Sequence, residues 1–141
     1  MKLKVLIALV GLVICSVQVF GADQKSTPAA PAKQATKVKL VSVEEFDKLR
    51  ANKANIVLDV RTPDEFKAGH ISGATNIDYT SPDFGEKVAK LDKEKMYLVH
   101  CAAGTRSAKA CKKMEGLGFK NLFDLHAGFS GWEEAGKPVE K

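Results

Sequence analysis

The sequence has few cysteines, little excess charge and no apolar run long enough to span a bilayer comfortably. Three cysteines in 141 residues are too few for a disulfide scaffold, and no Cys-x-x-Cys pair is present to begin a zinc or iron–sulfur site. Setting aside Lys2 and Lys4 leaves 20 cations against 17 anions, and a net charge of +3 does not indicate nucleic-acid binding. What is present is a globular composition, 45% hydrophobic and 28% charged, which excludes collagen-like, wholly disordered and multi-span membrane proteins.

Residues 1–21 have the order of a secretory signal peptide. Two lysines precede an apolar stretch over 5–20, which ends in the small residues Gly21 and Ala22. The stretch is shorter than the roughly 20 apolar residues of a comfortable membrane span, and Gln18 interrupts it. We therefore expect cleavage after Gly21 and a periplasmic or secreted protein, with an uncleaved membrane anchor as the alternative.

The rest of the chain divides into a linker and one domain. Residues 22–37 offer no apolar face to bury, so they are expected to be a flexible linker. Residues 38–141 are enough for a single domain with one modest core. We expect a monomer that contacts no nucleic acid, and that contacts a membrane only through the N-terminal segment if this is not cleaved.

Predicted strands and helices alternate along the domain. Short, β-branched apolar runs predict strands at 55–61, 74–77, 96–100 and 122–125. Capping boxes at Ser42 and Thr62 begin two helices, and apolar periodicity and glycine stops predict three more over 82–91, 107–115 and 129–135. This alternation indicates an α/β three-layer fold, with a central parallel sheet of four to five strands and helices on both faces.

The loop after Cys101 has the composition of an anion site. Cys101 follows a predicted strand, small residues come next, and a helix begins shortly after, so successive amides and the helix dipole can favour a thiolate. Gly104 can take the left-handed conformation that such a loop needs. Arg106 opposes the helix dipole, so a negative partner is expected: either the bound substrate or, as we prefer, a carboxylate such as Asp59 or Glu65. The alternative is that Cys101 is an inert core residue.

Several motifs together resemble the rhodanese family of single-domain sulfurtransferases, in order and over nearly the whole domain. The loop itself reads Cys101-Ala-Ala-Gly-Thr-Arg106-Ser107. The other matching motifs are Leu58-Asp59-Val60-Arg61, Glu65-Phe66, Gly69-His70-Ile71-x-Gly73-Ala74, Asn76-Ile77 and Gly128-Phe129-x-Gly131-Trp132.

The resemblance implies a parallel-sheet α/β fold and an enzyme of the thiosulfate:cyanide sulfurtransferase class. It implies that Cys101 is the catalytic sulfur acceptor, cycling between thiolate and persulfide. The amides of Ala102, Ala103, Gly104, Thr105 and Arg106 would bind the transferred sulfur, and Asp59 with Arg61 would flank it in support. The expected partners are a small sulfur donor, such as thiosulfate, a polysulfide or a persulfide, and an acceptor such as cyanide or a thiol. No metal or organic cofactor is required.

Two other functions remain open. His100-Cys101 followed by Arg106 and Ser107 is also similar to the tyrosine-phosphatase signature, which would suggest a phosphatase or an arsenate reductase. Only four residues separate Cys101 from Arg106, one fewer than that signature has, and the narrower ring suits one sulfur atom better than a phosphate. The second alternative is a non-catalytic persulfide carrier or binding module, which would hold sulfur but turn over slowly.

Other reactive residue types have plainer interpretations. Cys111 has the spacing of a core-facing helix position, and a disulfide with Cys101 is not expected without rearrangement. The three histidines lack ligand spacing, so no zinc site is predicted. Where thiosulfate-using members of that family often carry a basic residue directly after the cysteine, this chain has Ala102 and Ala103. Fewer cations should weaken the binding of the dianion thiosulfate, so a polysulfide, a small persulfide or a protein persulfide is the alternative donor.

Overall fold

The computed structural model of the chain describes residues 37–141. The expected signal peptide over 1–21 and the linker over 22–37, apart from its last residue, lie outside the described residues. Within 37–141 no helix combines the length and the apolar character needed to cross a membrane.

The centre of the domain is a five-stranded sheet in the order β1-β6-β5-β2-β4. Its strands in chain order are β1 (Lys39–Val41), β2 (Ile56–Asp59), β4 (Thr75–Asn76), β5 (Met96–His100) and β6 (Asn121–Leu125). Every pair is parallel. The α/β fold with a parallel sheet, expected from the alternating pattern, is confirmed.

Five helices connect the strands. They are α1 (Val43–Arg50), α2 (Pro63–Ala68), α3 (Phe84–Ala89), α4 (Thr105–Gly116) and α5 (Gly128–Glu134). The two predicted capping sites begin helices as expected. The Ser42 hydroxyl accepts from the Glu45 amide at 3.2 Å, and Thr62 and Glu65 form a complete capping box. α4 starts at Thr105, two residues before its predicted start, because Gly104 ends the loop in a left-handed turn and no capping side chain marks the boundary.

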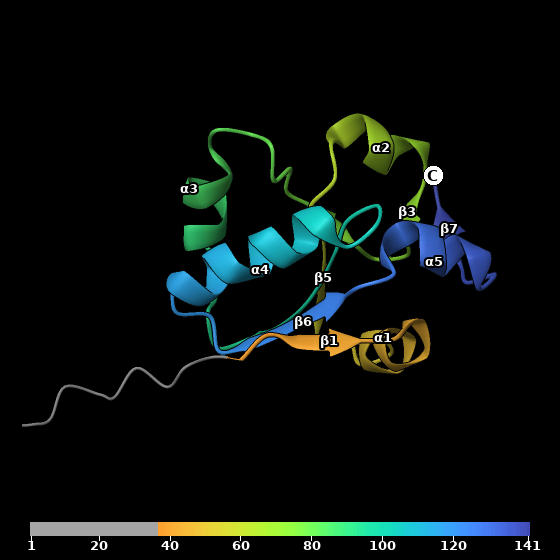
Figure 1. Cartoon of the computed structure of the whole chain (residues 1–141), viewed down its shortest axis with the longest axis horizontal. Helices are drawn as coiled ribbons and strands as arrows, with labels where there is room; N and C mark the ends of the chain where they lie inside the picture. The colour runs from red at the N-terminus through yellow and green to blue at the C-terminus, as the bar shows by residue number, and fades with distance from the viewer. Residues whose placement is uncertain (1–36) are drawn as a thin grey trace, which may run out of the picture. The chain divides into compact units, whose positions relative to one another are not determined.

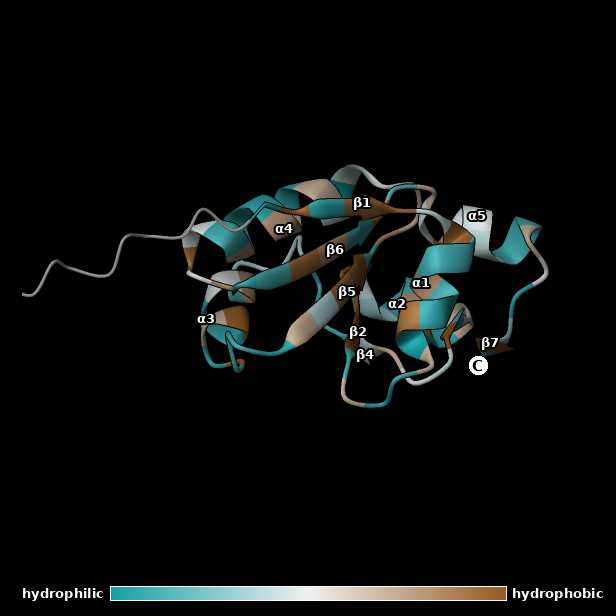
Figure 2. Cartoon of the chain, turned by 90° about the horizontal axis from the view of Figure 1, so that it is seen from below, coloured by the Kyte–Doolittle hydropathy of each residue, from teal (hydrophilic) through white to brown (hydrophobic). Residues whose placement is uncertain are grey.

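Two hydrophobic clusters fill the two sides of the sheet. One contains Leu58, Tyr97 and Val99 with α3 and α4 residues, and the other contains Val57 and Leu98 with α1 and α5 residues. Neighbouring strand residues thus alternate between the two cores, as the pleat requires. Figure 1 shows α4 lying across the strands, and Figure 2 shows the hydrophobic residues concentrated in the central strands. Helices on both faces are therefore confirmed.

A second, two-stranded sheet pairs β3 (His70–Ile71) with β7 (Val139–Glu140) in antiparallel orientation. The sequence patterns did not predict these two-residue strands or the edge strand β1. The indole Nε1–H of Trp132 donates to the Pro138 carbonyl at 2.9 Å and ties the chain before β7 back onto α5. The C-terminal end is thereby fixed beside the segment that follows α2.

Candidate active site

The carboxyl ends of β2 and β5 bring Asp59 and the residue before Cys101 together. Asp59 lies opposite His100 in the register of the two strands, so the polar residues after both strands occur at the same edge of the sheet. This is the edge at which ligands bind in parallel α/β sheets.

The loop that begins at Cys101 is held from one side by the start of α5. The Phe129 amide donates to the Cys101 carbonyl at 2.7 Å, and the Ser130 amide donates to the Ala102 carbonyl at 3.0 Å. Gly128 permits this close approach, because a Cβ at that position would collide with the Ala102 carbonyl oxygen. Two carbonyls of the loop are thus satisfied on the α5 side.

One loop amide contacts the Cys101 sulfur directly. The Gly104 N–H donates to Sγ at 3.1 Å. Gly104 has a φ of 86°, and an added Cβ would collide with the His126 carbonyl oxygen, so only glycine fits here. The Ala108 amide makes the first bond of the helix, to the Gly104 carbonyl at 3.1 Å. The amides of Thr105, Arg106 and Ser107 precede it and have no partner within the helix.

Accessibility around the thiol is uneven. Cys101 is only 1% exposed, while Ala103 and Thr105 on the rim of the loop are exposed. The thiol is thus buried, whereas two small residues of the loop that follows it are exposed.

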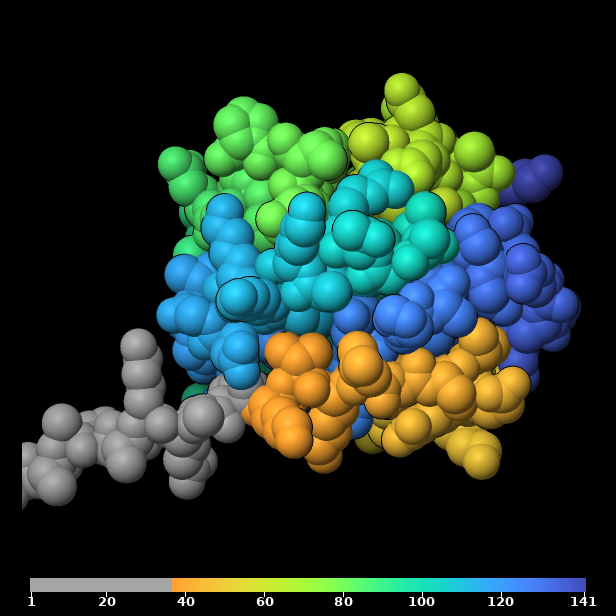
Figure 3. Space-filling model, viewed as in Figure 1, coloured from red at the N-terminus to blue at the C-terminus, as the bar shows by residue number. Residues whose placement is uncertain are grey.

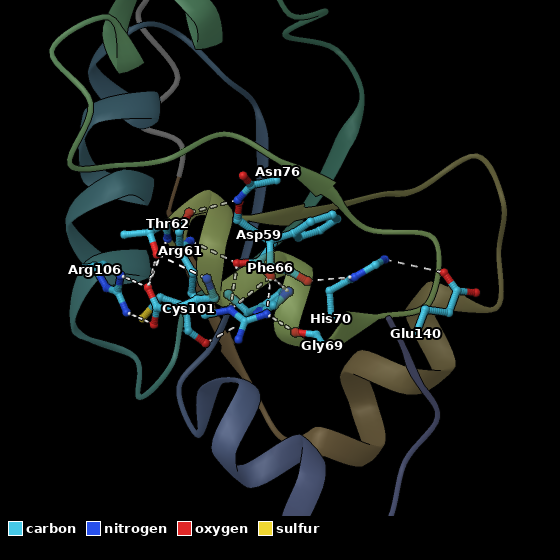
Figure 4. A network of polar contacts seen from close by, with 12 residues as sticks. Asp59, Arg61, Thr62, Phe66, Gly69, His70, Asn76, Cys101, Arg106 and Glu140 are labelled. Atoms are coloured by element: carbon cyan, nitrogen blue, oxygen red, sulfur yellow. Dashed lines mark hydrogen bonds and ion pairs between the residues drawn. The ribbon is translucent and has the colours of Figure 1, made fainter.

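Arg106 is paired with Glu65 of α2. Two guanidinium nitrogens donate to the two carboxylate oxygens at 2.7 and 2.8 Å, a bidentate pair that joins the start of α4 to α2 (Figure 4). Figure 3 shows the yellow-green residues of α2 packed against the cyan start of α4. The Arg106 guanidinium lowers the pKa of Glu65 from 4.5 to about 2. Of the two carboxylates expected from the sequence as partners, Glu65 is the one used.

Asp59 and Arg61 form a buried ion pair beneath the loop. Arg61 Nη2 donates to Asp59 Oδ2 and to the Gly69 carbonyl, both at 2.7 Å, and its guanidinium lies 4.0 Å from the centre of the Phe129 ring. The Asp59 carboxylate and the Arg61 guanidinium are thus paired with each other within this network (Figure 4). The pair supports the loop through Phe129, whose amide binds the Cys101 carbonyl.

His100 belongs to the same buried group. Its Nε2 lies 3.7 Å from Asp59 Oδ2 without a hydrogen-bond partner, and its ring packs against Phe46 and Phe129. Burial lowers the pKa of His100 from 6.5 to about 4, although Asp59 opposes that shift. The imidazole is therefore neutral at pH 7 and acts as packing rather than as a charge.

The remaining cysteine and histidine predictions can be compared with the structure directly. Cys111 is fully buried in the α3–α4 core, and burial raises the pKa of its thiol strongly. Cys101 and Cys111 are both free thiols. Over residues 37–141 no three His, Cys, Asp or Glu side chains are grouped as they would be around a metal ion. Sequence reasoning missed the Phe129 and Ser130 amides, because backbone donors carry no residue-type signal.

Comparisons with known proteins agree with this geometry. The family model described as "Rhodanese-like domain" matches residues 42–135. Thiosulfate sulfurtransferase GlpE of Pseudomonas entomophila is 37% identical, with 67% of this chain and 84% of that protein covered. Thiosulfate sulfurtransferase 16, chloroplastic, of Arabidopsis thaliana is 37% identical over 59% of this chain and 78% of its own length. A rhodanese-related protein from Thermoplasma volcanium has a crystal structure that covers 72% of this chain and 97% of its own, with 33% identity and a TM-score of 0.64.

Proposed function

This chain belongs to the rhodanese-like family, and we propose that it is a sulfurtransferase whose Cys101 carries the sulfur as a persulfide. The observation that carries the proposal is the Gly104 N–H donating to Cys101 Sγ, inside a loop whose first two carbonyls are bound elsewhere. The names of the two relatives above support the same reaction class.

The cycle has two nucleophilic steps. The Cys101 thiolate attacks the outer sulfur of the donor; with thiosulfate, the donor S–S bond breaks and its electron pair leaves with sulfite. Cys101 then carries a persulfide whose terminal sulfur is negative, and the loop amides stabilise it as an oxyanion hole stabilises an alkoxide. Cyanide or a thiolate next attacks this terminal sulfur. The bond between Cys101 Sγ and the terminal sulfur breaks, and its electron pair returns to Sγ as the thiolate.

The charges around the loop favour a donor less charged than thiosulfate. The Arg106 guanidinium is bound to Glu65, and the Arg61 guanidinium is bound to Asp59 and Gly69. Ala102 and Ala103 add no cation, so the loop offers a dianion little side-chain attraction. We propose that a small persulfide, whose sulfur carries one negative charge, is used more efficiently than the dianion thiosulfate, although the relatives' names support thiosulfate as one donor.

A phosphatase or arsenate-reductase function is less well supported. Such chemistry needs an arginine that binds a tetrahedral oxyanion, and two of the five Arg106 donors are already bound to Glu65. Four residues between Cys101 and Arg106 also leave a short ring of amides. A phosphate ester therefore serves as the negative control in the experiment below.

The decisive experiment compares Cys101→Ser with Cys111→Ala in the full chain. With thiosulfate and polysulfide donors, Cys101→Ser is expected to lose all sulfur transfer. Cys111→Ala, which removes a buried thiol kept in the neutral form, is expected to keep it. Transfer that survives without Cys101 would refute the mechanism. Stoichiometric loading of Cys101 without turnover would identify a persulfide carrier, and hydrolysis of the phosphate ester would identify a phosphatase.

The donor preference has its own test. Ala103 lies on the exposed rim, so Ala103→Lys adds a cation at little steric cost, and Ala103→Gln is its neutral control. A surface charge contact of about 0.6–1 kcal/mol lowers the KM for thiosulfate about threefold to fivefold, and the gain shrinks with added salt. An equal effect of lysine and glutamine would contradict the charge argument.

We also propose that residues 1–21 direct export. The intact mass of the mature protein from the periplasmic or secreted fraction is expected to correspond to a chain that begins at Ala22. Recovery of the full-length chain in the membrane fraction would instead identify an uncleaved anchor.

A further inference from the structure

Asp124 is a buried carboxyl that the proposed reaction does not use. It is 0% exposed on β6, and among the described residues neither carboxyl oxygen has a hydrogen-bond partner. Leu122, two residues earlier, belongs to the α3–α4 core, so strand alternation puts Asp124 on that same side, the side on which Cys101 packs. A buried carboxyl without partners is costly, which calls for an explanation.

The groups around Asp124 come from three neighbouring elements. The Ser107 hydroxyl and the Cys111 thiol of α4, and His126 after β6, lie near enough to affect the pKa of Asp124 or to be affected by it, and Ser107 donates to the Gly104 carbonyl rather than to the carboxyl. β5 lies opposite with Val99, two residues before Cys101, and β1 pairs through the uncharged Leu40. Burial raises the pKa of Asp124, while Ser107 and His126 oppose the shift. Asp124 therefore stays protonated to a higher pH than an ordinary aspartate.

Ser107 connects this carboxyl to the thiol. The Ser107 hydroxyl, itself fully buried, donates to the Gly104 carbonyl at 3.1 Å. The amide of that same Gly104 donates to Cys101 Sγ at 3.1 Å. A change in the direction of the Ser107 hydroxyl would therefore affect Gly104, whose amide binds the Cys101 sulfur.

We propose that Asp124 is a positioning residue for Cys101, which supports the Ser107–Gly104 contact when protonated and opposes an anion at Cys101 when ionised. When Asp124 is protonated, the Ser107 hydroxyl keeps its hydrogen bond to the Gly104 carbonyl. Ionised Asp124 competes as an acceptor for the Ser107 hydroxyl, and it adds a like charge on the core side that contains Cys101, opposite Val99, which lies two residues before that cysteine. The inference rests on the proposed role of Cys101 as the residue that carries a negative sulfur.

The test is the pH dependence of Cys101 alkylation by iodoacetamide, followed by peptide mapping to separate Cys101 from the other cysteines. Asp124→Asn keeps the shape and removes the charge, so the midpoint of Cys101 alkylation is expected to fall by about one pH unit, a tenfold gain in thiolate below the midpoint. Glu133→Gln, an exposed carboxylate on α5, is the control and is expected to leave the profile unchanged. An Asp124→Asn profile that coincides with that of the unmodified protein would overturn the proposal.

A second measurement needs no substitution. A carbon-13 NMR titration of the unmodified protein is expected to show Asp124 ionising at higher pH than the exposed aspartates, with the Gly104 amide shift following the same midpoint. A Gly104 amide that ignores the Asp124 titration would contradict the connection through Ser107. Neither measurement uses sulfur transfer, so a failure of the Asp124 test is distinguishable from a failure of the sulfur-transfer assay that tests the proposed function.

Discussion

Replacing Glu65 by glutamine isolates the charge that connects α2 to the active-site loop. The glutamine side chain keeps an oxygen for the Thr62 amide and hydroxyl, so the capping box survives. The bidentate contact with Arg106 loses its ionic character, and the Arg106 cation is left opposing the α4 dipole.

The magnitude follows from the shifted carboxyl. A fall in the pKa of Glu65 from 4.5 to about 2 corresponds to about 3 kcal/mol at 1.36 kcal/mol per unit. Because the Glu65 side chain is 35% exposed, solvent screening reduces this to about 1–2 kcal/mol of folding stability at pH 7. A depressed carboxyl pKa stabilises the fold above pH 4.5, and this contribution is lost as the pH falls from 4.5 towards 2.

Urea unfolding at pH 7 and at pH 3 measures both effects. At pH 7 the Glu65→Gln variant is expected to be less stable by about 1–2 kcal/mol. The difference shrinks at pH 3, because Glu65 of the unfolded chain is then protonated while Glu65 of the folded protein is still mostly ionised. Asp64→Asn, an exposed neighbour in α2, is the matched control. Equal stability of Glu65→Gln and the unmodified protein at pH 7 would refute the reasoning, and so would a deficit that does not depend on pH.

Two further predictions follow from the buried parts of the site. Gly104→Ala forces a residue with a side chain into a left-handed conformation, with its Cβ against the His126 carbonyl. It is expected to lower the free energy of unfolding in urea by about 2 kcal/mol or more and to reduce sulfur transfer at least tenfold. Normal stability and transfer would show that the loop tolerates another shape. The lowered pKa of His100 makes the fold less stable as the pH falls from 6.5 to about 4. The unmodified protein is expected to lose up to about 3 kcal/mol of folding stability over that range. A parallel decline in His100→Gln would assign the loss to other groups.

The central strands could be predicted because their residues are buried on both sides. Met96–Val99 is a continuous apolar run that ends at His100, and the observed β5 has the predicted bounds, Met96–His100. β1 carries two exposed residues among its three, and β3 and β7 have two residues each, so neither alternation nor a run distinguishes them from loop. The β3–β7 pairing joins segments about 70 positions apart, and only tertiary contact defines it.

The site was predictable in its residue types but only partly in its partners. The Cys101 loop has a clear composition, and the dipole argument favoured a carboxylate beside Arg106. Composition could not decide between Asp59 and Glu65, because that choice depends on how the start of α4 lies against α2. Asp124 does carry a signal, since alternation with Leu122 puts it on a core-facing position of a predicted strand.

The carbonyls and the amides of the loop have different partners, and this explains how α5, near the C-terminus, influences the geometry around the Cys101 thiol. Peptide groups in a tight turn carry a donor and an acceptor on opposite sides, so amides can converge on the sulfur only if the carbonyls find partners elsewhere. The first amides of α5 provide those partners for Cys101 and Ala102. Phe129 is in turn held by the Arg61 guanidinium, which Asp59 and Gly69 fix in place. A buried ion pair that never contacts the sulfur thereby orients the groups that do.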